Sequence, residues 1–195
     1  MIPNKEPQMK RDELINRPKF YKAIRIALFD KLSQLQVDGI EAILNECEAQ
    51  KVTDIRHIAY IFATAYHEGV NLKTGERIVP VIEGGSQTYL RSKKYFPYVG
   101  RGYVQLTWDY NYQRYTKIMG IDFMKQPDLL LDVKNSAFIL VHGMVNGIFT
   151  GKKLKDYIGV KTDFVNARRI INGTDKASLI ASHANGFLTA INASL

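Results

Sequence analysis

Carboxyl side chains are the groups in this sequence best suited to chemistry. Glu68 ends a strongly patterned apolar segment, and Glu76 and Glu83 lie in the irregular stretch beyond it. Cleavage of a glycosidic bond uses two carboxyl groups, one protonated to assist the leaving oxygen and one ionised to activate water or attack carbon. A carboxyl at the end of a helix suits the proton donor, because the helix dipole disfavours a negative charge there. Glu76 and Glu83 both remain candidates for the second role.

The sequence gives less support to other catalytic mechanisms. His67 and Glu68 begin the zinc motif H-E-x-x-H, but Asn71 stands where the second histidine is needed. Cys47 falls on the apolar stripe of a predicted helix, which favours a buried, inert thiol over a nucleophile. The sequence has no G-x-S-x-G elbow and no phosphate-binding glycine fingerprint. Acid–base chemistry by carboxylates is therefore favoured, with no metal and no organic cofactor.

A segment rich in aromatic and amide side chains follows the carboxylates, in YFPYVGRGYVQLTWDYNY. Aromatic rings can stack on sugar rings, and Asn, Gln and Thr can bind hydroxyl and amide groups without adding charge. Their clustering next to a glycine turn favours a polymer-binding surface over a core segment. The residues that supply this mixture are Tyr95, Phe96, Tyr98, Tyr103, Gln105, Thr107, Trp108 and Asn111.

The elements that must position these groups are mostly helical. Ser33 and Gln36 have the spacing of a capping box, which predicts a helix to about Gln50. The next helix begins near Thr53 or Asp54 and ends at Gly69, so that Glu68 lies in its last turn. No helical period is sustained from 70 to 99, where RIVPVIE predicts a short strand. Further helices are expected at 20–28, 109–119, 133–149 and 163–171, and from 175 onward.

These patterns predict a single, mainly α domain over 1–195, with an irregular or β-hairpin insertion at its centre and a polar N-terminal lead-in over 1–17. The composition, 46% hydrophobic and 24% charged, is that of a globular protein, and a single cysteine allows no intrachain disulfide. No apolar run has the length of a membrane span, and the N-terminal segment lacks the apolar core of a signal peptide.

The net charge of +8 favours an anionic partner: nucleic acid, an acidic membrane surface or an anionic wall polymer. The basic residues are dispersed apart from short pairs such as Lys93-Lys94 and Arg168-Arg169. A dispersed excess is more typical of solubility than of recognition. No specific nucleic-acid partner is therefore expected.

The segments AYHEG, YVGRGYVQLTWDYNY and NARRIING resemble glycoside hydrolase family 19, the chitinase and phage-lysozyme group, over Leu32 to the C-terminus. The resemblance implies a lysozyme-like α+β fold with a deep cleft and an inverting mechanism. It implies Glu68 as general acid, Glu83 as general base with Glu76 as the alternative, and Thr107 as holder of the attacking water. The predicted substrate-binding residues are Tyr98, Tyr103, Gln105, Asn111 and Asn172.

Two positions depart from the family pattern. Gly69 follows the acid where Thr or Ser is usual, and Thr174 follows Asn172-Gly173 where many members have a second glycine. Neither change removes a catalytic group, but both bear on the fine preference for substrate.

The leading functional prediction is a phage-type endolysin that hydrolyses the β-1,4 bonds of bacterial peptidoglycan. A chitinase, or a wall-binding module without catalysis, is the alternative. The proportions and the absence of a secretory segment resemble phage-encoded members more than plant chitinases. A monomer is expected, made in the host cytoplasm without a signal peptide and acting on the wall after release or as part of a virion.

Overall fold

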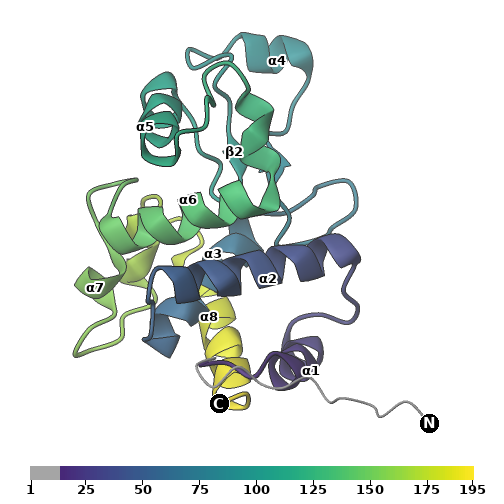
Figure 1. Cartoon of the computed structure of the whole chain (residues 1–195), viewed down its shortest axis with the longest axis vertical. Helices are drawn as coiled ribbons and strands as arrows, with labels where there is room; N and C mark the ends of the chain where they lie inside the picture. The colour runs from purple at the N-terminus through teal and green to yellow at the C-terminus, as the bar shows by residue number, and fades with distance from the viewer. Residues whose placement is uncertain (1–13) are drawn as a thin grey trace.

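A computed structural model describes residues 14–195 as a mainly helical fold (Figure 1). The α-helices are α1 (Arg17–Ala27), α2 (Gln34–Ala49), α3 (Ile55–Glu68), α4 (Gln87–Arg91), α5 (Asp109–Met119), α6 (Val133–Asn146), α7 (Leu154–Tyr157) and α8 (Ala177–Asn192). Two 3-10 helices, η1 (Pro127–Leu131) and η2 (Asn166–Ile170), and two short strands, β1 (Val81–Ile82) and β2 (Arg101–Gly102), complete the elements. The predicted mainly α class with a small hairpin insertion is confirmed.

Helix α3 forms the centre of the core. Its residues from His57 to Ala65 are all buried, as expected for a helix that is covered on every side. It packs mainly against α8 and also contacts α2 and α6. Figure 1 shows α2 and α6 side by side across the middle of the molecule, with α4, α5 and the strands beyond one side and α1 beyond the other.

Local signals fix the ends of the helices that lead to Glu68. The capping box of α2 is present, since the Ser33 backbone N–H donates to Gln36 Oε1 at 3.0 Å and the Gln36 backbone N–H donates to Ser33 Oγ at 3.3 Å. Asp54 caps α3 by accepting a hydrogen bond from the Arg56 backbone N–H at 2.9 Å. Glu68 is the last residue of α3, as the sequence predicted.

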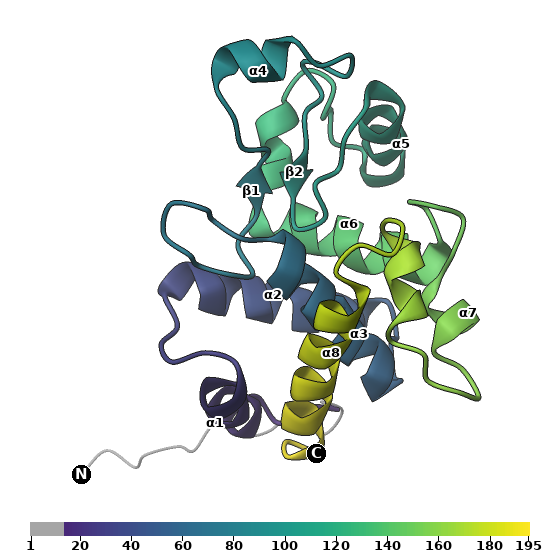
Figure 2. The same cartoon turned by 180° about the vertical axis from the view of Figure 1, so that it is seen from behind.

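The insertion is an antiparallel hairpin in which Val81 pairs with Gly102 and Ile82 with Arg101 (Figure 2). The connection between the strands contains the five-residue helix α4, which the sequence did not predict. Arg101 anchors the hairpin, because its buried guanidinium donates to Asp128 Oδ1 at 3.0 Å and to the Tyr112 hydroxyl at 2.9 Å. The hairpin is thereby tied to η1 and α5.

Several boundaries differ from the sequence prediction. The helix expected at 133–149 ends at Asn146, where Gly147 adopts a left-handed conformation with φ of 70°. The segment expected as a helix at 163–171 is the 3-10 helix η2, and the short helix α7 was not predicted. Most of the predicted lead-in lies outside the described residues, but Ile15, at its end, is buried in the core.

Two further expectations concern burial and the membrane. The Cys47 thiol is buried on the core side of α2, and this burial raises its pKa well above the usual range, so it is inert as predicted. Within residues 14–195, no helix is long and apolar enough to cross a membrane.

Candidate active site

A cavity of about 800 Å³ lies where the end of α3 meets the following loop and the hairpin. Both Glu68 and Glu83 line it, so the structure brings the predicted acid and one of the two candidate bases to the same cavity. The other lining residues that matter below are His67, Asn71, Lys73, Arg77, Gln105, Leu131 and Leu179. Such a volume is in the range of small-molecule and substrate sites.

Glu68 is paired with a cation that the sequence analysis did not single out. Its Oε1 accepts a hydrogen bond from Arg168 Nη1 at 2.5 Å, and the two side chains are 19% and 4% exposed. Arg168 comes from η2 and also donates through Nε to the carbonyl of Asp175 at 3.0 Å. The guanidinium holds the Glu68 carboxyl group in place at the end of α3 through a charge-assisted hydrogen bond. The available signal was the Arg168-Arg169 pair within NARRIING.

Two hydrogen-bond donors hold the side chain of Glu83, the residue that follows β1. Its Oε1 accepts from the Tyr95 hydroxyl at 2.8 Å, and its Oε2 accepts from the Gly100 backbone N–H at 3.1 Å. The Glu83 backbone N–H in turn donates to the Gly100 carbonyl at 2.7 Å. These two donors fix the orientation of both carboxyl oxygens of Glu83. The same hydrogen bond is the main reason that the pKa of Tyr95 is raised to about 12.

Glu76 does not line this cavity. It lies in the turn after Asn71, where its Oε2 accepts a hydrogen bond from the Thr74 hydroxyl at 3.0 Å. The Asn71 backbone N–H donates to the Glu76 carbonyl at 2.8 Å and closes the turn. The carboxylate of Glu76 is thus engaged within its own turn.

Gln105 reaches the cavity wall from the loop after β2. Its Nε2 donates to the Val81 carbonyl at 2.9 Å, and its backbone has a φ of 52°, which is uncommon for a residue with a side chain. A Cβ at Gly100 would lie 2.8 Å from Gln105 Oε1, so the Gln105 side chain packs directly against this glycine. Gly100 therefore contacts both Glu83, through its backbone N–H, and the side chain of Gln105.

Thr107, Asn111 and Tyr98 do not line the cavity. The Thr107 hydroxyl donates to the Gln105 carbonyl at 2.7 Å, and Asn111 Nδ2 donates to the Thr107 carbonyl at 2.8 Å. The Tyr98 ring packs edge-on against Tyr112, with 5.1 Å between the ring centroids. These contacts stabilise the segment that carries Gln105.

Two further predicted substrate-binding residues, in addition to Tyr98 and Asn111, are not brought to the cavity. Tyr103 is fully buried in the core, where its hydroxyl lies close to Gly39, so the prediction that it contacts substrate is wrong. Asn172 is exposed beyond η2, and its side-chain oxygen accepts from the Gly173 backbone N–H at 2.8 Å. An aromatic residue next to a glycine turn can serve the core as well as a ligand, and only the packing distinguishes the two.

Basic side chains and a histidine for which no role in the site was predicted also line the cavity. Arg77 donates to the Tyr66 carbonyl at 2.9 Å, and its guanidinium lies 4.5 Å from the centroid of the Tyr66 ring. Lys73 lines the same wall, so two basic side chains accompany the two carboxylates. Burial is the main cause that lowers the pKa of His67, which keeps its imidazole neutral at neutral pH.

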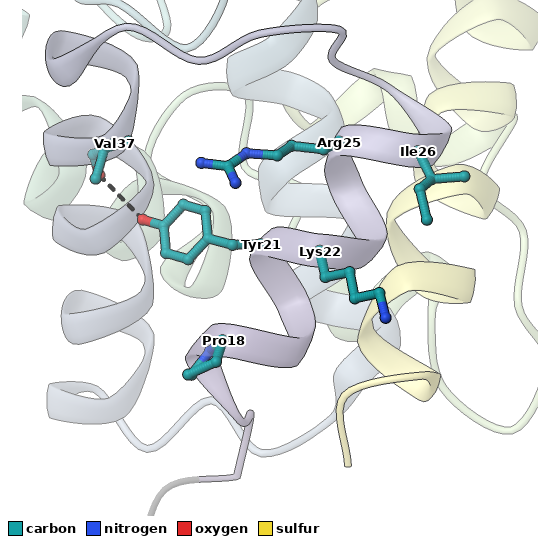
Figure 3. A pocket seen from close by; sticks show the side chains of 6 residues that line it. All are labelled: Pro18, Tyr21, Lys22, Arg25, Ile26 and Val37. Atoms are coloured by element: carbon teal, nitrogen blue, oxygen red, sulfur yellow. Dashed lines mark hydrogen bonds between the residues drawn. The ribbon is translucent and has the colours of Figure 1, made fainter. Parts of the chain in front are cut away.

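A second groove, of about 610 Å³, lies between α1 and α2 (Figure 3). Its lining residues are Pro18, Tyr21, Lys22, Arg25, Ile26 and Val37, and the Tyr21 hydroxyl donates to the Val37 carbonyl at 3.3 Å. None of these residues has a carboxyl group. The groove therefore lacks the groups for two-carboxylate chemistry, and the cavity at Glu68 is the candidate active site.

No protein-family model matches the sequence. An endochitinase of Arabidopsis thaliana is 35% identical over 91 residues, which cover 43% of this chain and 33% of that protein, so the match spans about a third of the relative.

Solved structures give broader coverage. Chitinase C from Streptomyces griseus HUT6037 superposes with a TM-score of 0.59 at 18% identity, over 95% of this chain and 94% of that one. A bacterial family 19 chitinase superposes with a TM-score of 0.56 at 20% identity, over 91% of this chain and 95% of that one. The chain therefore has the fold of family 19 chitinases, and the fold expected from the sequence resemblance is confirmed.

Proposed function

We propose that this protein is a glycoside hydrolase that cleaves β-1,4 bonds of an amino-sugar polymer with inversion at the anomeric carbon. The observation that carries this proposal is the presence of Glu68 and Glu83 on the walls of one cavity, each with its own hydrogen-bond partners. The fold shared with family 19 chitinases and the identity to an endochitinase support the same reaction class.

Glu68 acts as the general acid in this proposal. In its protonated form it gives a proton to the leaving oxygen as the glycosidic bond breaks. Arg168 then stabilises the carboxylate that remains, because its guanidinium lies within hydrogen-bond distance of Oε1. Arg168 is thus a positioning residue for the proposed acid.

Glu83 acts as the general base. The Tyr95 hydroxyl and the Gly100 backbone N–H each donate to one of its carboxyl oxygens and fix its orientation. It accepts a proton from a water molecule that attacks the face of the sugar opposite the leaving group. An inverting site needs about 6.5–9.5 Å between the two carboxyl groups to leave room for this water. Thr107, implied by the resemblance as the holder of the water, donates its hydroxyl to the Gln105 carbonyl and does not line the cavity, so this role stays a prediction.

We propose bacterial peptidoglycan as the substrate and an endolysin of the phage type as the role. The support is the resemblance of AYHEG, GRGYVQLTW and NARRIING, with a compact loop between them, to phage-encoded members of the family. Chitin is the second candidate, because the similar proteins named above are chitinases. The proposed route is synthesis in a host cytoplasm and action on the wall after release or from a virion, as a monomer.

Product analysis on purified peptidoglycan and on chitin oligomers tests both parts of the proposal. Mass spectrometry and reducing-end assays should detect cleavage by the wild-type protein, with faster release from peptidoglycan. Proton NMR taken early in the reaction should show the inverted anomer. Faster cleavage of chitin would overturn the substrate, and binding without new reducing ends would indicate a wall-binding module instead.

Three glutamine variants test the residue roles. Glu68→Gln and Glu83→Gln should each lower kcat by roughly 10²–10⁴-fold, the range for a lost acid or base. Glu76→Gln is the matched control and should keep wild-type activity, because its carboxylate bonds within its own turn. Full activity of Glu68→Gln would refute the acid. An inactive Glu76→Gln beside an active Glu83→Gln would move the base to Glu76.

A further inference from the structure

Two basic side chains line the candidate active site without a carboxylate partner. Lys73 and Arg77 belong to the loop that joins α3 to β1 (Figure 2), and both lie on the wall of the cavity that holds Glu68 and Glu83. Within residues 14–195, neither forms an ion pair with an acidic side chain. The proposed acid and base account for bond cleavage, so the role of these two cations has to be sought in what the substrate carries besides its sugar rings.

A tight turn after the end of α3 places Lys73 on the cavity wall. The side-chain oxygen of Asn71 accepts a hydrogen bond from the Lys73 backbone N–H at 3.0 Å, which fixes this turn. The tip of the turn comes close to the other side of the cavity, since a Cβ at Gly84 would lie 3.5 Å from Leu72 Cδ1. The turn therefore extends from the proposed acid to the segment that follows Glu83.

The Arg77 guanidinium is held in place but keeps donors for a ligand. Its Nη1 donates to the Tyr66 carbonyl at 2.9 Å, and the group lies 4.5 Å from the centroid of the Tyr66 ring. A guanidinium has five N–H donors in a planar fork, and this one makes no other hydrogen bond in the part of the chain that the structure describes. Burial is the main cause that lowers the pKa of His67 and of His183, and the charge of Arg77 lowers both further. The neighbouring histidines therefore stay neutral, and the positive charge on this wall comes from the arginine and the lysine.

Exposed leucine side chains accompany these cations. Leu72 is 84% exposed and Leu179, on α8, is 46% exposed, and both line the same cavity. A wall that combines cations with exposed apolar side chains is complementary to a peptide that carries carboxylates and small apolar side chains. The stem peptide of peptidoglycan, which is attached through the lactyl group of muramic acid, has this chemistry because it contains alanine and free carboxylates. Chitin carries no such substituent.

We propose that Lys73 and Arg77 form a subsite for the carboxylates of the stem peptide, so that the enzyme prefers glycan strands that carry peptides. This proposal rests on the proposed function, since the subsite lies in the cavity of the proposed acid and base. Arg77 binds a carboxylate through two N–H groups of its planar fork, whereas Lys73 attracts it as a flexible point charge. Both residues determine specificity, because they contact the substituent and not the bond that is cleaved.

The decisive comparison is between glycan strands with and without their stem peptides. An amidase removes the peptides and leaves the sugars and the lactyl carboxylates in place. The wild type should cleave the peptide-bearing strands with the higher kcat/KM. Arg77→Gln should lower the ratio of the two kcat/KM values about tenfold, which is the equivalent of a contact worth about 1.4 kcal/mol. Lys73→Gln should lower it about threefold, because Lys73 is exposed. Lys155→Gln is the matched control, since it removes an exposed lysine charge outside the cavity and should leave the ratio unchanged.

Binding is measured separately from cleavage by calorimetry in the Glu68→Gln background. The two ligands are the disaccharide of N-acetylglucosamine and N-acetylmuramic acid with its tetrapeptide and the same disaccharide without it. The peptide should tighten binding, and Arg77→Gln should remove most of this gain. Lys73→Gln, in an exposed turn, is the second variant if Arg77→Gln does not fold.

The outcomes separate the subsite from the hydrolase. Equal affinity for the two disaccharides, or a peptide-dependent gain that both variants retain, overturns the subsite even where the wild-type protein hydrolyses peptidoglycan. A gain that the variants lose, with no hydrolysis by the wild type, upholds the subsite and rejects the hydrolase.

Discussion

Replacing Arg168 by methionine tests how strongly the ion pair stabilises the candidate site. Methionine replaces the apolar stem of arginine but removes the guanidinium and its hydrogen bonds to Glu68 and to the Asp175 carbonyl. The carboxylate of Glu68, 19% exposed, is then left without its cation. We expect the protein to fold but to be clearly less stable.

The expected loss follows from the burial of the two partners. Removing one partner of a fully buried pair costs about 3–5 kcal/mol, whereas an exposed pair contributes about 0–1 kcal/mol. This pair lies between these limits, because Arg168 is 4% exposed and Glu68 still reaches solvent. We therefore expect Arg168→Met to lower the free energy of unfolding by about 2–3 kcal/mol. For a protein of this size that is a fall in Tm of roughly 4–12 °C.

A double-mutant cycle isolates the interaction between the two side chains. Chemical denaturation followed by circular dichroism gives the free energy of unfolding for the wild type, Arg168→Met, Glu68→Gln and the double variant. The double variant should be more stable than Arg168→Met alone, since glutamine leaves no uncompensated charge. A coupling of about 1–2 kcal/mol is expected. If the losses of the two single variants add to within about 0.5 kcal/mol, the pair has no energetic role and the reasoning is refuted.

Three further predictions concern the supports of the site. Gly39→Ala should lower the free energy of unfolding, measured in urea, by about 1–3 kcal/mol. The reason is that the added Cβ would lie 2.5 Å from the Tyr103 hydroxyl. An unchanged midpoint of urea unfolding would contradict this packing. The hydrogen bond from Arg56 lowers the pKa of Asp54 in the folded state, so the stability that this carboxylate contributes is complete above about pH 4 and is lost as the pH falls further. Asp54→Asn should therefore flatten the dependence of stability on pH in the acid range, and an unaltered slope would count against it. Tyr95→Phe removes the hydrogen bond to the proposed base and should lower kcat about tenfold. Circular dichroism should show that the fold is intact. A wild-type kcat would show that the hydroxyl is dispensable.

The sequence determined the elements whose signals are local. The capping box at Ser33 and the span from Asp54 to Gly69 fix α2 and α3, because caps and the helical period act between neighbours in the chain. The position of Glu68 in the last turn of α3 follows directly. The helices α4 and α7 were missed since, at five and four residues, they are too short to show a period.

Residue types alone did not show which residues are buried in the core and which line the cavity. Tyr103 and Gln105 lie in the same aromatic and amide-rich segment, yet one is fully buried against Gly39 and the other lines the cavity. Their separation depends on how the loop after β2 packs on α2. That packing joins residues far apart in the chain, so no local pattern records it.

Only the tertiary structure decided which groups meet at the cavity. Glu83 is brought there because its backbone and side chain both bond to Gly100 across the hairpin, while the side chain of Glu76 bonds within its own turn. Arg168 reaches Glu68 because η2 packs beside α8 at the end of α3. The sequence thus supplied the carboxyl groups and the helix that aims one of them. Their partners came from segments distant in the chain, which only the packing of the whole fold brings into contact.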